Sequence, residues 1–102
     1  MTYYIRTKVS LKFGQIAGYS EMMAKLVPFM ARHGWKLVFG LQPFIGDLAI
    51  LTHIWEVEEF ADIERALNAC KDDSEAHAIL APMPDLLHTE AMEVMVKTSY
   101  SP

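Results

Sequence analysis

Residues 35–57, WKLVFGLQPFIGDLAILTHIWEV, contain two runs rich in aromatic and β-branched residues on either side of Gly46 and Asp47. Such runs around a turn signal are typical of a β-hairpin. The spacing predicts strands over 35–45 and 48–57, joined by a short turn. This hairpin is the centre from which the rest of the fold is worked out.

The first hairpin strand also contains Gly40 and Pro43. These residues indicate a bulge or a sheet edge, because Pro cannot donate to a strand ladder and Gly weakens a strand interior. Both hairpin strands carry apolar side chains on each of their two faces. A strand that is apolar on both faces is buried on both faces, so we expect cover on both sides of the hairpin.

A helix is predicted on each side of the hairpin. Residues 15–33 follow the helical period, and Pro28 within them should kink the helix or end it early. Residues 59–70 follow the same period. After this helix, a further short helix is expected, capped by Ser74 and reaching about Leu80.

A strand is predicted at each end of the domain. Residues 3–13 alternate between an apolar set, which includes Ile5, Val9, Leu11 and Phe13, and a polar set. Residues 88–98 return to strand pattern, and residues 99–102 form a tail. The order strand, helix, strand, strand, helix, strand predicts a single α+β domain over 1–98. It is the ferredoxin-like split βαβ arrangement (βαββαβ), with a four-stranded antiparallel sheet and the helices on one face.

The chain is rich in apolar residues for its size, because 52% of its 102 residues are hydrophobic. Helices on one side cover only one face of the sheet, and the other face should be polar if it meets water. The hairpin does not fit that expectation, so we expect a second copy of the chain to cover this face. Two such sheets close into an eight-stranded α/β barrel that can hold side chains or one small ligand. The sequence therefore predicts a homodimer.

The composition argues against several partners and locations. A net charge of −4 does not suit nucleic acid, which requires a basic face. No apolar run reaches the roughly 18 residues of a membrane-spanning helix. The N-terminus begins in strand pattern, so no signal peptide is expected. Cys70 is the one cysteine and cannot form an internal disulfide, which fits a reducing cytoplasm.

Metal and cofactor sites are not expected either. The four histidines stand at positions 33, 53, 77 and 88, with no i, i+4 pair and no cysteine cluster. No glycine-rich phosphate loop opens a helix, so nucleotide cofactors lack a binding loop. The sequence therefore predicts a site for a small hydrophobic molecule that works without a bound cofactor or metal.

Several short segments resemble the NIPSNAP family of dimeric α/β barrels, and the resemblance runs over most of the chain. The matching segments are Ile5-Arg6-Thr7, Lys12-Phe13-Gly14, Leu37-Val38, Ile45-Gly46-Asp47 and His53-Ile54-Trp55. The family usually has Lys-Pro-Gly where this chain has Lys-Phe-Gly, and its common Asn after the hairpin turn is absent. The family has few assigned activities, so the resemblance implies the fold and the dimer more than an activity.

Residues 52–57, followed by His77 in a short helix, are also similar to plant-type polyketide cyclases of the dimeric α/β barrel fold. Those cyclases use a strand histidine and a helix histidine near one pocket. The spacing in this chain is a few residues longer, and the cyclases' helix tyrosine has no clear counterpart. The similarity implies shared geometry and not shared descent.

His53 and Arg6 are the candidate catalytic residues. His53 lies in an apolar strand and suits a general acid or base, because imidazole titrates near neutrality; a buried, hydrogen-bonded structural histidine is the alternative. Arg6 suits an anionic or enolate-like oxygen, and the alternative is a cross-strand ion pair with Glu93. We expect Arg6 and His53 to share the sheet face that the helices leave open.

The candidate substrate-binding residues surround these two. Lys8 and Glu93 are expected to point toward the barrel interior beside Arg6. Tyr4 and Trp55 are candidate aromatic walls of a pocket, with core packing or dimer contact as the alternative for each. His77 is the last candidate, and a surface position is its alternative.

Two functions fit these residues. The first is a cofactor-independent enzyme that transfers protons on a hydrophobic, carbonyl-bearing compound, such as a cyclase, an isomerase or a cofactor-free monooxygenase. His53 would be its general base or acid, and Arg6 would hold the oxyanion. The second is a non-catalytic, NIPSNAP-like module for ligand binding or assembly, in which His53 and Arg6 are tied up in internal pairs.

Overall fold

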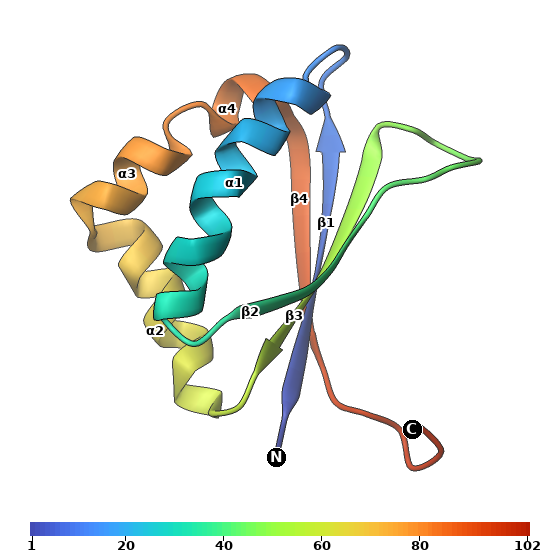
Figure 1. The fold of residues 1–102 in the computed structure, drawn as a ribbon, viewed down its shortest axis with the longest axis vertical. Coiled ribbons are helices and arrows are strands. Elements are labelled where there is room, and N and C mark those ends of the chain that lie inside the picture. Colours follow the sequence, from blue (N-terminus) through green and yellow to red (C-terminus); the bar gives the residue numbers. More distant parts are fainter.

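A computed structural model describes all of residues 1–102, with the four helices on one side of a single sheet (Figure 1). The elements are β1 (Tyr3–Leu11), α1 (Ile16–Arg32), β2 (Lys36–Leu41), β3 (Ile50–Val57), α2 (Phe60–Asp72), α3 (Ser74–Leu80), α4 (Met83–Leu86) and β4 (Leu87–Met95). The predicted ferredoxin-like βαββαβ arrangement is confirmed. The short helix α4 was not predicted.

The sheet has the strand order β2-β3-β1-β4, and every neighbouring pair is antiparallel. β1 and β3 are therefore central, while β2 and β4 are edge strands. β2 has a register irregularity between Leu37 and Phe39. The bulge and the edge that Gly40 and Pro43 indicated are both present, although the bulge lies at Val38.

The two central strands alternate between a buried face and an open face. The buried side chains face the helices and are Ile5, Thr7, Val9 and Leu11 from β1 and Leu51, His53, Trp55 and Val57 from β3. Thr7 and His53 stand directly opposite one another in the β1–β3 register. They are the two polar or charged residues among the buried set.

The Thr7–His53 row divides the hydrophobic core into two clusters. Ile5 and Trp55, on one side of the row, belong to a cluster of nine buried residues. Val9 and Leu51, on the other side, belong to a cluster of six. A polar row across the middle of a core costs stability unless its groups are paired, so this row is the part of the interior whose role packing does not explain.

The hairpin connection is longer than predicted. β2 ends at Leu41 and β3 begins at Ile50, and the intervening loop extends away from the sheet (Figure 1). Pro43 cannot donate to a ladder, Gly46 has a φ of +130°, and Asp47 accepts a hydrogen bond from the Ala49 amide at 3.1 Å. These local features favour a longer loop over a tight two-residue turn.

The first strand is also shorter than predicted. Gly14 has a φ of +77°, and Phe13 before it lies beyond β1 and is fully exposed. Helix α1, in contrast, continues through Pro28 to Arg32. None of the helices combines the length and the apolar character that a membrane crossing requires.

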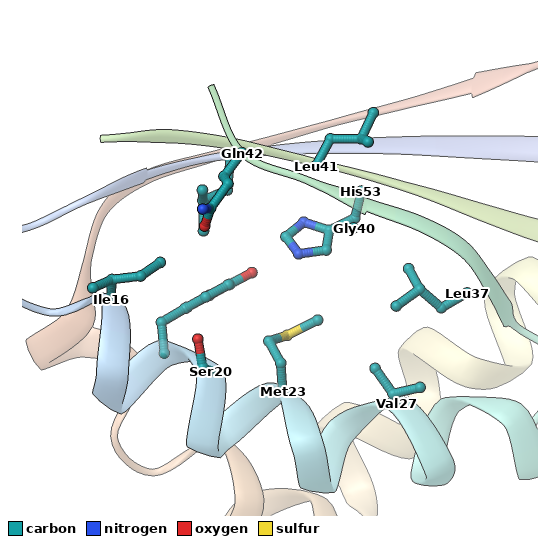
Figure 2. Close-up of a pocket in the computed structure, with 11 residues that line it drawn as sticks. Ile16, Ser20, Met23, Val27, Leu37, Gly40, Leu41, Gln42 and His53 are labelled. Carbon is teal, nitrogen blue, oxygen red and sulfur yellow. The ribbon is translucent and has the colours of Figure 1, made fainter. Parts of the chain in front are cut away.

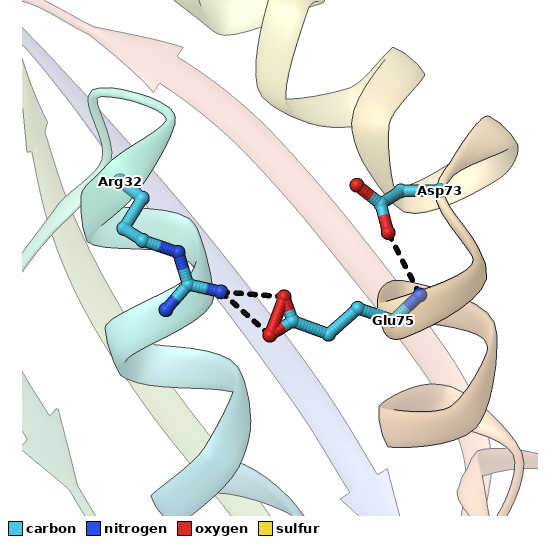
Figure 3. A network of polar contacts seen from close by, with 3 residues as sticks. All are labelled: Arg32, Asp73 and Glu75. Carbon is cyan, nitrogen blue, oxygen red and sulfur yellow. Dashed lines mark hydrogen bonds and ion pairs between the residues drawn. The ribbon is translucent and has the colours of Figure 1, made fainter.

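The N-terminus of α3 is capped by Asp73 and not, as expected, by Ser74 (Figure 3). The Asp73 carboxylate accepts a hydrogen bond from the Glu75 amide at 2.7 Å. Glu75 in turn accepts a bidentate interaction from Arg32 of α1, at 2.6 and 2.7 Å. The cap and the ion pair together fix α3 against α1 on the helical layer.

Replacing the cap should destabilise the domain. Asp73→Ala leaves the Glu75 amide without its acceptor, and we expect a loss of about 1 kcal/mol in the free energy of unfolding. Ser74→Ala is the matched control and should change little, because its side chain caps nothing. Urea unfolding of the two variants measures the difference, and equal losses would contradict the assignment of the cap to Asp73.

Candidate functional site

A cavity of about 300 Å³ lies between α1 and the β2–β3 side of the sheet (Figure 2). This volume is at the lower end of the range for small-molecule sites, about 300–1,000 Å³. Its walls are mostly apolar, with a few polar groups among them. The lining residues are Ile16, Tyr19, Ser20, Met23, Val27, Leu37, Gly40, Leu41, Gln42, Leu51 and His53.

Among the titratable side chains that line this cavity, His53 has the ordinary pKa closest to 7. Its imidazole points from β3 toward α1 (Figure 2), it is 6% exposed, and its Nδ1 has no hydrogen-bond partner. The Tyr19 ring lies against it, with 5.8 Å between ring centroids. Burial lowers the pKa of His53 below its ordinary value of 6.5. The imidazole is therefore neutral at pH 7 and able to accept a proton.

Three other polar side chains lie buried around His53 without a side-chain hydrogen bond, and these are Thr7, Tyr19 and Trp55. The Trp55 Nε1 is fully enclosed and unpaired. Trp35, which contacts Trp55 edge to face, instead donates its Nε1 proton to the Asp62 carbonyl at 3.0 Å. Buried polar groups are nearly always paired, so the enclosed and unpaired His53 Nδ1 and Trp55 Nε1 make this part of the interior the candidate site.

A second cavity of about 150 Å³ adjoins the first, and Tyr19 and Met23 line both. Apolar and aromatic residues form most of its wall, with Glu90 of β4 among them. Glu90 remains exposed on one side, yet the apolar residues behind it raise the pKa of its carboxyl. Burial and, to a smaller extent, the Glu90 charge raise the pKa of the Tyr19 phenol. Tyr19 is therefore a neutral hydroxyl at pH 7.

Tyr19 and Glu90 were not predicted as site residues. Tyr19 belongs to the buried side of α1, where the helical period predicts core packing and gives no signal for a role of its hydroxyl. Glu90 alternates with Met92 and Val94 along β4, and the three share the helix-covered face because Met92 stands opposite Thr7. The period of two could have placed Glu90 on that face, since Met92 and Val94 are apolar.

The structure does not bring Arg6 and His53 together, so the expectation that they share the open face is wrong. His53 stands opposite Thr7, and Arg6 is the neighbour of Thr7 along β1 and points to the other face. There Arg6 forms an ion pair with Glu93, its partner in the β1–β4 register. The cross-strand pair proposed as the alternative role of Arg6 is thus present.

The other predicted residues divide between the two faces. Tyr4 and Lys8 lie on the open face with Arg6, and the Tyr4 ring is covered by the Lys97 ammonium at 5.8 Å. Trp55 lies in the helix-covered interior and lines the smaller cavity. His77 is exposed on α3, where its Nε2 contacts the Lys71 carbonyl, and it lines neither cavity. The cyclase-like pairing of His53 with His77 is therefore absent.

Comparison with known proteins supports the fold of the chain. The sequence pattern of the NIPSNAP family matches residues 2–102, whereas no curated protein matches the chain. A NIPSNAP family protein from Agrobacterium tumefaciens superimposes with a TM-score of 0.87 at 16% identity, covering 100% of this chain and 98% of the other. A second protein of that family and organism, with unknown function, gives a TM-score of 0.86 at 22% identity, covering 99% and 92%.

A further similar structure is that of SnoaB, a cofactor-independent oxygenase from Streptomyces nogalater. It superimposes with a TM-score of 0.78 at 16% identity, covering 99% of this chain and 97% of the other. At this identity the likeness shows a shared fold. Function has to be argued from the residues of the site itself.

The stability of the domain should fall as the pH drops below 6.5. His53 in the unfolded chain has its ordinary pKa of 6.5, whereas burial keeps its folded-state pKa lower. Protons therefore bind more strongly to the unfolded chain, and stability is lost as the pH falls from 6.5 through the folded-state pKa. Urea unfolding across this range measures the loss.

His53→Phe should remove this part of the pH dependence, because the variant has no imidazole to protonate at the buried position. His77→Ala removes an exposed histidine and should leave the dependence as it is. A His53→Phe protein that kept the full wild-type slope below pH 6.5 would show that other groups cause the loss.

Proposed function

The chain belongs to the NIPSNAP family, and we propose that it binds a hydrophobic carbonyl compound between α1 and the sheet and moves protons at the carbon next to the carbonyl. The observation that carries this proposal is His53, a buried neutral imidazole without a hydrogen-bond partner that borders an apolar cavity of about 300 Å³. Isomerisation, cyclisation and cofactor-free oxygenation all begin with this step. The similarity to a cofactor-independent oxygenase agrees with such chemistry on this fold.

His53 takes the role of general base in this proposal. Its Nε2 lone pair removes a proton from the carbon beside the carbonyl, the C–H electron pair forms a C=C bond, and the carbonyl π pair moves to oxygen. The product is an enolate and an imidazolium. Returning the proton to another carbon completes an isomerisation. We assign the base to Nε2 because Nδ1 is fully enclosed, whereas Nε2 lies on the ring edge that faces Gly40.

Tyr19 replaces Arg6 as the group that stabilises the enolate oxygen. Arg6 lies on the opposite face of the sheet and is paired with Glu93. Tyr19 is 4% exposed, contacts the His53 ring and makes no side-chain hydrogen bond. Because its phenol keeps its proton at neutral pH, its hydroxyl can donate to a developing oxyanion.

We also propose that the open face of the sheet pairs with a second copy of the chain to form the eight-stranded barrel. Phe39 and Leu41 on this face are 58% and 51% exposed in the single chain. Phe44 and Ile45 of the hairpin loop are 96% and 89% exposed. Large apolar side chains that are exposed in this number favour an association site. A second copy fits because Arg6 and Glu93 provide both charge signs near the centre of a self-complementary face.

Solvent exchange of a simple aromatic ketone tests the proposed chemistry. The wild-type protein should speed the exchange of the α-protons of 1-indanone in D₂O, followed by proton NMR. His53→Gln should lose about 10²–10⁴-fold of this acceleration, the usual contribution of a general base. Tyr19→Phe should lose a smaller part of the acceleration and should still bind the ketone.

Arg6→Gln is the matched control, because it removes a charge from the opposite face, and it should exchange 1-indanone at the wild-type rate. Calorimetry, which measures binding of the ketone, distinguishes an enzyme from a non-catalytic ligand-binding module. If the wild type binds the ketone but does not exchange it, the chain is a ligand-binding module and the catalytic proposal is wrong. Exchange that survives His53→Gln in a folded protein would also exclude His53 as the base.

Sedimentation velocity at micromolar concentration tests the dimer. The wild type should sediment as a dimer, and Phe39→Glu should produce monomers because it places a charge among the apolar side chains of the proposed interface. Lys25→Glu on the outer face of α1 places the same carboxylate away from the proposed interface, with a larger change in net charge, and should remain dimeric. A wild-type protein that is monomeric at this concentration would refute the assembly.

A further inference from the structure

Gly40 occupies a position where the backbone does not require glycine. It is the fifth of the six residues of the edge strand β2, and it is not among the glycines with positive φ. Glycine in a strand interior weakens the strand, since it has no side chain to pack and more freedom to lose. A strand glycine without positive φ marks a bulge or a place where something approaches the backbone closely, and the bulge of β2 lies at Val38 rather than at Gly40.

His53 is the residue that Gly40 faces. The two stand opposite one another in the β2–β3 register, and both line the larger cavity (Figure 2). A Cβ at position 40 would lie 3.5 Å from His53 Cδ2 and 3.9 Å from His53 Nε2. These are ordinary van der Waals distances, so a methyl group would fit there and would cover that edge of the imidazole.

The remaining sides of the imidazole are already covered. The Tyr19 ring packs against it from α1, Nδ1 is enclosed, and Thr7 stands beside it on β1. The Cδ2–Nε2 edge next to Gly40 is thus the edge from which a ligand in the cavity can reach a ring nitrogen. β2 is also the edge strand of the sheet on this side, so the approach does not cross another strand.

We propose that Gly40 is the specificity-determining residue of this site: its missing side chain leaves the Cδ2–Nε2 edge of His53 open and sets how much bulk a ligand carries at its reacting carbon. The space that a methyl group at position 40 would fill is the space beside Nε2. A carbonyl compound with a substituent on its reacting carbon places that substituent there. The ligand class rests on the proposed function, whereas the access to His53 does not.

The access is measured without any ligand by acylation of histidines with diethyl pyrocarbonate, followed by mass spectrometry of peptides. The reagent attacks neutral imidazole nitrogens. His53 should react in the wild type, more slowly in Gly40→Ala, and severalfold more slowly again in Gly40→Val. The exposed His88 serves as the internal reference in each sample.

Lys36→Val is the matched control, because it adds the same side chain to β2 at a position that pairs with Glu56 rather than His53. It should leave His53 acylation at the wild-type rate. Urea unfolding checks the fold of each variant, and Gly40→Ala should be at least as stable as the wild type because its φ suits alanine. A folded Gly40→Val protein with wild-type His53 reactivity, or a wild type in which His53 does not react at all, overturns the proposal.

A pair of ketones that differ by one methyl group tests specificity. The wild type should exchange the α-protons of both 1-indanone and 2-methyl-1-indanone, whose extra methyl lies on the reacting carbon. Gly40→Ala should reduce exchange of the second ketone about tenfold or more beyond any loss on the first, the usual discrimination for one methyl group. Equal losses on both ketones would contradict the proposed role. If the wild type exchanges neither, the proposed function fails while the acylation result still decides the access.

Discussion

The β1–β3 register that sets Thr7 opposite His53 is the constraint on which the interior depends. Side chains alternate along a strand, so a shift of β3 by one residue against β1 would move His53 to the open face, opposite Arg6 or Lys8. The observed register places His53 beneath α1, lowers its pKa by burial and leaves Arg6 to pair with Glu93 outside. Every later property of the site follows from this choice of face.

The row formed by Thr7 and His53 reduces the apolar packing of the core. Ile5 with Trp55, and Val9 with Leu51, belong to two separate apolar clusters, and the polar row lies between them. Aliphatic residues in that row would join the clusters into one core and bury more apolar area. The chain instead keeps a threonine and an unpaired histidine there, next to a cavity. Natural proteins break local packing rules mainly at functional sites, and this row is where the present chain breaks them.

The order of the elements could be predicted from the sequence because that order depends on local periodicity. The face of His53 could not, because residues 50–57 are apolar on both faces and period alone cannot orient such a strand. The register depends instead on pairing with β1 and on a loop that is longer than the Gly46-Asp47 signal indicated. Helix α4 was not predicted because the helical segment was expected to end at about Leu80, although Pro84 in the next segment is well suited to the first turn of a helix.

The two faces of the sheet have separate proposed roles in this NIPSNAP protein. The cavity beside His53 is lined by α1, β2 and β3 of one chain, so a single copy provides the whole proposed site. Assembly through the open face would bury Phe39 and the Arg6–Glu93 pair without touching His53. The mouth of the site at Gly40 lies on the edge strand, where the barrel need not cover it. An interface and a pocket on opposite faces of one sheet can therefore change independently, which suits a fold that is shared by chains of low sequence identity.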